Sequence, residues 1–98
     1  MLNLFSDPLQ NIADQANMSE RQLYRVFLKE VGVSPAHYLE ELRMEVASTL
    51  LASSQQAIKA IAFSVGYRSH DGFNRAFQRR YSISPLKYRQ IFSSNENH

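Results

Sequence analysis

The chain has 98 residues, no cysteine and a formal net charge of +2 at pH 7, a length that builds one small domain or two very small helical lobes and does not favour a deep substrate cavity. The missing cysteines exclude a disulfide framework and a thiolate zinc site, and the three histidines, His37, His70 and His98, are too scattered to indicate a metal cluster. No run approaches the ~20 apolar residues of a membrane span, so we expect a soluble, cytoplasmic protein without a cofactor.

The first element expected is a short helix. Pro8 suits the first position of a helix, and apolar residues at helical spacing continue the pattern as far as Asn17. Asparagine is the residue after glycine that best tolerates the left-handed region, so the helix is expected to stop there. The apolar face consists of Leu9, Ile12, Ala13 and Ala16.

A second helix is expected to begin after Ser19 and to end at Gly32. The side chain of Ser19 can cap the helix, and Gln22 at the third helical position completes a capping box. The predicted apolar stripe is Leu23, Val26, Phe27 and Val31. The outward residues are then Arg21, Gln22, Tyr24, Arg25, Leu28 and Lys29.

A single long helix is expected from Pro35 to Ala52, because Ser34 supplies an N-cap and Pro35 suits the first turn. At a rise of 1.5 Å per residue it spans about 27 Å, enough to separate two small lobes. Its predicted stripe is Leu39, Leu42, Val46 and Leu50, with Ala47 and Leu51 packing against one lobe. The polar run Ser53 to Gln56 breaks it.

The segment from Ala57 to Arg89 predicts a second helix, turn and helix. Gly66 can stop the first of these helices in the left-handed region, and Ser69 can cap the next. The apolar positions are Ile58, Ile61, Ala62 and Val65 on the first helix, and Phe73, Ala76, Phe77 and Tyr81 on the second. This spacing turns Asp71, Asn74, Arg75, Gln78 and Arg79 outward. A last short helix is expected from Ser84-Pro85 to Phe92.

The two helix-turn-helix patterns are copies of one supersecondary unit. At an offset of 50 the identical pairs are Ser19/Ser69, Arg25/Arg75, Phe27/Phe77, Ser34/Ser84, Pro35/Pro85 and Tyr38/Tyr88. Upstream of the turn the offset is 49, which pairs Ile12-Ala13 with Ile61-Ala62. The expected fold is therefore all-α, with about seven helices. It comprises a first helix-turn-helix subdomain at 1–33, a linker helix at 34–53, a second subdomain at 54–92 and a polar tail at 93–98.

The positive charge is concentrated in the second copy. Residues 1–53 carry four Lys and Arg against seven Asp and Glu, a net charge of −3, whereas residues 54–92 carry seven against one, a net charge of +6. A strongly basic half is typical of a segment that binds a polyanion, although a solvated basic face gives the same count. The outward residues of the second copy are hydrogen-bonding and mostly basic, as base edges and phosphates require.

These residues resemble the DNA-binding domain of the AraC/XylS family of bacterial transcriptional regulators, over roughly Leu9 to Phe92. The family signature is matched by Ile61-Ala62, Val65-Gly66-Tyr67, Phe73-Asn-Arg-Ala-Phe77, Arg79-Arg80-Tyr81 and Ser84-Pro85-x-x-Tyr88-Arg89. Two departures concern turns, because Ser82 stands where the family usually has glycine and Asn17 where its first copy often has one. Family members also tend to have a helix before the first copy, for which only residues 1–6 remain here.

The resemblance implies that the second helix of each copy enters a major groove of duplex DNA, the two helices in successive grooves on one face. Carried over by position, the base-reading residues would be Arg21, Tyr24, Arg25, His70, Asp71, Asn74 and Arg75. Phosphate contacts would come from Gln22, Lys29, Ser69, Gln78 and Arg79. The implied partners are an operator, RNA polymerase and an N-terminal effector or dimerisation domain outside this chain, acting in the bacterial cytoplasm at the nucleoid.

Other interpretations of these residues stay open on sequence alone. Arg25 can pair with Glu20 or Glu30, and Arg75 with Asp71, as structural salt bridges. His70 and Asp71 can simply form a helix N-terminus, where an aspartate is favoured by the macrodipole. The side chains of Arg43 and Arg80 lie toward the core side of their helices and are expected to extend their charge to solvent or to pair.

An enzyme is not expected, since the chain has no nucleophile-elbow pattern, phosphate-binding glycine loop or H-E-x-x-H motif. Glu40-Glu41 is better interpreted as a solvated face than as an acid/base pair. The stronger rival to DNA binding is a helical protein-interaction module in which Tyr24 and Leu28 contact a partner helix. Salt-dependent binding to duplex DNA distinguishes these two functions.

Overall fold

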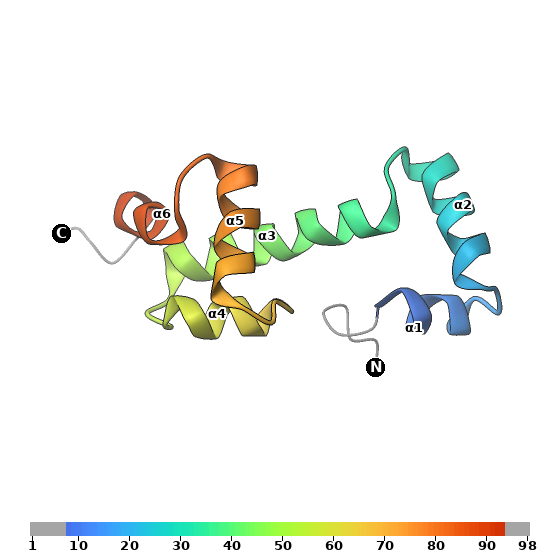
Figure 1. Cartoon of the computed structure of the whole chain (residues 1–98), viewed down its shortest axis with the longest axis horizontal. Coiled ribbons are helices and arrows are strands. Elements are labelled where there is room, and N and C mark those ends of the chain that lie inside the picture. Colours follow the sequence, from blue (N-terminus) through green and yellow to red (C-terminus); the bar gives the residue numbers. More distant parts are fainter. Residues whose placement is uncertain (1–7, 94–98) are drawn as a thin grey trace. The chain divides into compact units, whose positions relative to one another are not determined.

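The computed structural model describes residues 8–93, and this part of the chain is all-α, as predicted (Figure 1). It contains six helices, against about seven expected, and a further helix before Pro8 would fall on residues outside the described part. The helices are α1 (Pro8–Gln15), α2 (Glu20–Val31), α3 (Pro35–Ser53), α4 (Ile58–Ser64), α5 (His70–Tyr81) and α6 (Pro85–Phe92). None of these helices is long and apolar enough to cross a membrane.

The chain divides into two compact units at a point inside α3. Among the described residues, the N-terminal unit extends to Leu42 and the C-terminal unit begins at Arg43. The long helix therefore supplies residues to both units: its first two turns belong to the N-terminal unit and the remainder to the C-terminal unit.

Serine side chains begin four of the six described helices. The hydroxyl oxygens of Ser19, Ser34, Ser69 and Ser84 accept from the backbone N–H three residues ahead at 3.1, 3.2, 3.0 and 3.1 Å. Each bond satisfies one N–H that has no partner within its helix. Ser19 and Gln22 form the predicted capping box. Because Ser19 pairs with Ser69 and Ser34 with Ser84 in the sequence repeat, the repeat is present in the capping geometry of both units.

The helix ends repeat in the same way. Asn17 and Gly66, at an offset of 49, have φ angles of 61° and 97°, and Gly32 and Ser82, at an offset of 50, have 93° and 68°. All four residues lie in the left-handed region, where glycine is favoured. The predictions that Asn17, Gly32 and Gly66 end helices are confirmed.

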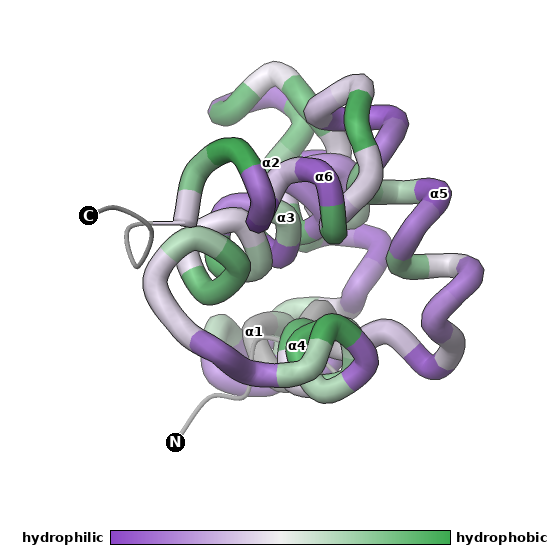
Figure 2. The backbone as a smooth tube through the Cα atoms, turned by 90° about the vertical axis from the view of Figure 1, so that its left-hand side faces the viewer, coloured by the Kyte–Doolittle hydropathy of each residue, from purple (hydrophilic) through white to green (hydrophobic). Residues whose placement is uncertain are grey.

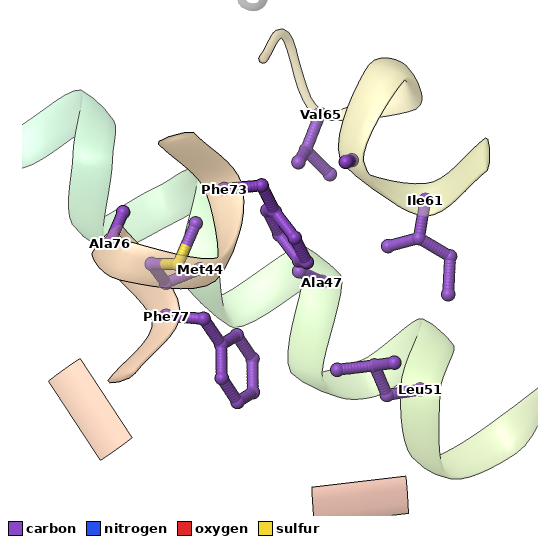
Figure 3. Close-up of a cluster of buried hydrophobic side chains, with 9 residues drawn as sticks. Met44, Ala47, Leu51, Ile61, Val65, Phe73, Ala76 and Phe77 are labelled. Atoms are coloured by element: carbon purple, nitrogen blue, oxygen red, sulfur yellow. The ribbon is translucent and has the colours of Figure 1, made fainter. Parts of the chain in front are cut away.

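The core of the C-terminal unit is assembled from α3, α4 and α5 (Figure 3). The ring of Phe73 is directed from α5 toward Ala47 of α3, and both residues are fully buried. Three residues come from each of the three segments: Met44, Ala47 and Leu51; Ile61, Ala62 and Val65; and Phe73, Ala76 and Phe77. Ala47 and Leu51 pack against this unit as predicted.

A chain of aromatic contacts extends the core to α6. The ring of Phe77 lies 4.6 Å from that of Tyr81 and 5.4 Å from that of Tyr88, and Tyr88 lies 4.5 Å from Phe92. The hydroxyl of Tyr81 donates to the carbonyl of Met44 at 3.3 Å, which also ties α5 to α3. Aromatic pairs at such distances add stability beyond that of their buried area.

The N-terminal unit has a smaller core among its described side chains. Ala13 of α1 and Leu23 of α2 are buried, and the ring of Phe27 lies 5.4 Å from that of Tyr38 at the start of α3. The side chains of Leu9 and Ile12, expected on the apolar face of α1, lie outside the described part. Ala16, expected on the same face, is exposed.

The predicted stripes of α2 and α3 are wrong at three positions. Val26 and Val31 are each 48% exposed, because the N-terminal unit covers the side of α2 that carries Leu23 and Phe27. On α3, Val46 is 39% exposed while Met44, absent from the predicted stripe, is fully buried. Apolar residues lie on more than one side of this helix, so periodicity alone does not select the side that packs.

We expect Ser82→Gly to raise the free energy of unfolding by about 0.5–1 kcal/mol, because a left-handed conformation costs a non-glycine residue about 1–2 kcal/mol and glycine returns part of this as chain entropy. Urea denaturation followed by circular dichroism measures the change. Ser82→Ala is the matched control: it retains the Cβ, so it should bring no gain. Equal stabilisation by both substitutions would show that the φ of 68° at this position is not a source of strain.

Candidate nucleic-acid interface

The segment between α4 and α5 forms a compact turn. The backbone N–H groups of Gly66 and Tyr67 donate to the carbonyls of Phe63 and Ala62 at 3.0 Å, and α5 then begins with its Ser69 cap. A Cβ at position 72 would lie 3.1 Å from the Ser69 oxygen, so glycine at this position lets the cap approach closely. Helix, turn and capped helix thus follow in the order that the sequence predicts.

The buried residues of α5 determine which of its other side chains face solvent. Phe73, Ala76 and Phe77 are at most 2% exposed, which fixes the rotation of the helix about its axis. The outward turns of α5 are hydrophilic along the helix (Figure 2). Of the predicted site residues in this unit, those exposed are Ser69, His70, Asp71, Arg75, Gln78 and Arg79, whereas Asn74 is half-buried.

Two of these residues contact each other. The side-chain nitrogen of Asn74 lies 3.5 Å from Nδ1 of His70, one turn earlier on α5. The spacing of four residues places both side chains on the same stripe of the helix. Both residues were predicted at the site from the sequence, but their contact was not, although the spacing of four residues is visible there.

The predicted site residues of α2 are exposed in the N-terminal unit. Arg21, Arg25 and Lys29 are accessible to solvent, and Tyr24 is 45% exposed. Gln22 is exposed too, but its side-chain oxygen accepts from the backbone N–H of Ser19 at 2.9 Å. Only the amide N–H groups of Gln22 therefore remain available as donors to a phosphate.

The salt bridges considered as alternatives for the two repeated arginines are not formed. Within residues 8–93, no hydrogen bond or ion pair joins Arg25 to Glu20 or Glu30, or Arg75 to Asp71. In the N-terminal unit, Nε2 of His37 lies 3.3 Å from a carboxylate oxygen of Glu41, one turn later on α3. Arg25 and Arg75 thus occupy the same outward position on α2 and α5 without an ion-pair partner in the described part of the chain.

Not every basic residue of the C-terminal unit belongs to this face. Arg89 is half-buried, and its Nε donates to the carbonyl of Leu51 at 3.1 Å in the last turn of α3. A guanidinium group at this position satisfies a carbonyl that has no partner within its helix and complements the negative end of the helix dipole. The sequence count of +6 included Arg89, but its role here is to join α6 to α3.

Arg43 and Arg80 contact aromatic rings; Arg43 is half-buried, but Arg80, expected on the core side of its helix, is exposed. The guanidinium carbon of Arg43 lies 5.6 Å from the ring centre of Tyr67, and that of Arg80 lies 5.6 Å from the ring centre of Tyr81. Both are cation–π distances. No group of three or more His, Asp or Glu side chains within residues 8–93 is placed to hold a metal ion.

Comparison with known proteins identifies the family. A family model described as a helix-turn-helix domain matches residues 12–91. An uncharacterized HTH-type transcriptional regulator of Haemophilus influenzae is 38% identical over 85 residues, which cover 87% of this chain and 28% of that protein. A solved regulator of Chromobacterium violaceum with an AraC-type DNA-binding domain has a TM-score of 0.79 and 28% identity, covering 90% of this chain and 79% of that one.

The chain belongs to the AraC/XylS family. Another structural relative is the DNA-binding domain of AdpA, solved in complex with a target DNA, with a TM-score of 0.79 and 30% identity; the match covers 86% of this chain and 76% of that one. The chain spans 25–32% of the length of the first curated AraC/XylS relatives that it matches. Ser82, which departs from the usual glycine of the AraC/XylS signature, adopts the left-handed conformation all the same.

Replacement of Arg89 by methionine should lower the free energy of unfolding by about 1–2 kcal/mol, because the aliphatic packing is kept while the bond to the Leu51 carbonyl is lost. Lys87→Met is the control, since Lys87 is exposed on the same helix and should change stability by less than about 0.5 kcal/mol. Urea denaturation compares the two variants. An equal effect of both substitutions would contradict a capping role for Arg89.

Proposed function

We propose that this domain binds duplex DNA in a sequence-dependent manner and regulates bacterial transcription, with α2 and α5 each entering a major groove. The observation that carries the proposal is the geometry of α5. Its aromatic face is fully buried, its N-terminus is capped by Ser69, and its opposite face presents hydrogen-bonding and basic side chains. A helix held in this way can present its first turns to base edges, as recognition helices do.

The proposed base contacts and phosphate contacts follow from the hydrogen-bonding chemistry of the side chains. Arginine can pair with the two acceptors of guanine, asparagine with adenine, and aspartate can accept from the cytosine amino group. We assign base contacts to Arg21, Tyr24, Arg25, His70, Asp71, Asn74 and Arg75, and phosphate contacts to Gln22, Lys29, Ser69, Gln78 and Arg79. The role is binding without catalysis, in the cytoplasm, in a longer regulator whose other domain senses an effector and which also contacts RNA polymerase.

Titration of a labelled duplex pool with the protein between 50 and 200 mM salt tests the proposal. Binding should weaken steeply with salt, because each neutralised phosphate contributes about 0.9 to the slope of log K against log salt. Selection from random duplexes should then recover a preferred sequence. Salt-independent or absent binding to DNA would overturn the proposal.

A second candidate function is a protein-interaction module on α2. Tyr24, Val26 and Leu28 are between 44% and 48% exposed, so this helix presents apolar groups beside its basic ones. Such a surface suits an amphipathic partner helix. Tyr24→Ala would then weaken binding to a protein partner without changing the salt dependence of DNA binding.

Arg75→Ala should weaken binding to the selected sequence by roughly 1–3 kcal/mol and relax the preference at one base pair, because a paired guanine would lose its two donors. Repeated selection with the variant measures both changes. A variant that keeps the wild-type preference at every position would show that Arg75 does not contact a base.

Arg79 lies one turn further along α5 and provides the matched comparison. Its replacement by alanine should weaken binding to all sequences alike and reduce the salt slope by about 1, because a phosphate contact carries no sequence information. Anisotropy titrations on the selected duplex and on a scrambled one give both quantities. A loss confined to the selected duplex would reassign Arg79 to a base.

A further inference from the structure

The contact between His70 and Asn74 limits how the Asn74 amide can be oriented. The nitrogen of that amide faces Nδ1 of the imidazole at 3.5 Å, the outer limit of hydrogen-bond length. An amide nitrogen only donates, so this contact is a hydrogen bond when Nδ1 carries no proton, as in the neutral tautomer protonated on Nε2. A bond of this length adds little stability, but it favours one of the two orientations of the amide over the other.

The selected orientation suits adenine. The Asn74 nitrogen carries two hydrogens, and donation of one to His70 leaves the other beside the side-chain oxygen. This N–H and this oxygen are the pair that asparagine uses to contact N7 and the N6 amino group of adenine. His70 and Asn74 lie in the first two turns of α5, the part of a recognition helix that contacts base edges.

Protonation of His70 would reverse this preference. Both ring nitrogens of an imidazolium are donors, so the ring would repel the amide nitrogen and attract the side-chain oxygen of Asn74. The amide would then present its two N–H groups outward, and these match the N7 and O6 acceptors of guanine. An imidazole changes its charge between about pH 5 and 8, so this change is accessible in solution.

We propose that His70 is a positioning residue that orients the Asn74 amide toward adenine when neutral and toward guanine when protonated. The proposal deepens the DNA-binding function proposed above and rests on it. This role replaces the direct base contact assigned to His70 above: His70 contributes to base recognition through Asn74, and α5 contains a specificity element that depends on pH.

Within the described part of the chain, the contact with Asn74 is the polar interaction that the His70 side chain makes. The charged groups closest in sequence are Arg68 in the turn and Asp71 and Arg75 on α5. No hydrogen bond or ion pair within residues 8–93 joins the imidazole to these groups or to charged side chains of the packed helices. Those side chains are Arg43 and Glu45 of α3, Lys59 of α4, and Lys87 and Arg89 of α6.

The test measures adenine-to-guanine preference at one position and two pH values. Selection at pH 8.0 with the wild-type protein and with Asn74→Ala identifies the base pair whose preference depends on Asn74. Affinities are then compared for duplexes with adenine or guanine there, at pH 8.0 and pH 5.5. The wild type should prefer adenine at pH 8.0, and the ratio of the two affinities should fall by about two- to fivefold at pH 5.5, the amount that one weak hydrogen bond can shift. Because it is a ratio, the general gain in DNA affinity from added positive charge cancels.

Two variants of His70 separate positioning from direct contact. His70→Asn places an acceptor oxygen where Nδ1 stands and cannot titrate, so it should keep the adenine preference at both pH values. His70→Ala should lower the preference at both, and the double variant with Asn74→Ala should be no worse than Asn74→Ala alone, because the two residues act as one unit. Thermal melting followed by circular dichroism confirms that each variant is folded.

Three outcomes would overturn the proposal. An unchanged adenine preference in folded His70→Ala would show that Asn74 orients itself. Losses from His70→Ala and Asn74→Ala that add would show that His70 touches DNA independently. If the wild type selects a sequence but Asn74→Ala relaxes no position, the positioning role is wrong while DNA binding stands; if the wild type selects no sequence, the proposed function fails and this inference with it.

Discussion

Burial of one face of α5 is the constraint on which the candidate interface depends. Phe73, Ala76 and Phe77 are enclosed by α3 and α4, so the rotation of the recognition helix is fixed before any ligand arrives. Close packing of a core tolerates little change in the volume or direction of these side chains. The packing of the buried residues therefore determines which side of α5 faces solvent. An interface that is already ordered avoids part of the entropy cost of binding.

Hydrogen bonds to the part of α3 that belongs to the C-terminal unit stabilise this arrangement. Tyr81 from α5 and Arg89 from α6 both donate to backbone carbonyls of α3, at 3.3 and 3.1 Å. The rings of Phe77, Tyr81 and Tyr88 contact one another, with centres 4.6 to 5.4 Å apart. Tyr81 and Arg89, two polar residues of the family signature, thus stabilise the fold. The positive charge of Arg89 therefore has a different role from the positive charges on the exposed face of α5.

Local features of the structure were predictable from the sequence because they depend on local chemistry. The serine caps, the left-handed residues at Asn17, Gly32 and Gly66, and the inward face of α5 all follow from short-range patterns. The exposure of Val26, Val31 and Val46 and the burial of Met44 could not be predicted, since they depend on which side of a helix meets a neighbour. The same holds for Arg89, whose sequence position indicated only a positive charge. Among the site residues, exposure was predicted for all but the half-buried Asn74, and the contact between Asn74 and His70 required coordinates.

Because α3 contributes residues to both units, the position of a fragment boundary or chimera junction decides whether the C-terminal unit keeps its core. Met44, Ala47 and Leu51 supply a third of the buried cluster of the C-terminal unit, yet they precede its helix-turn-helix pattern in the chain. A fragment that begins after Ser53 would expose the apolar faces of α4 and α5 where these three side chains belong, and exposed apolar surface of this kind promotes aggregation. Chimeras that transplant α5 therefore need a junction ahead of Arg43, so that the part of α3 that completes the core is transferred as well.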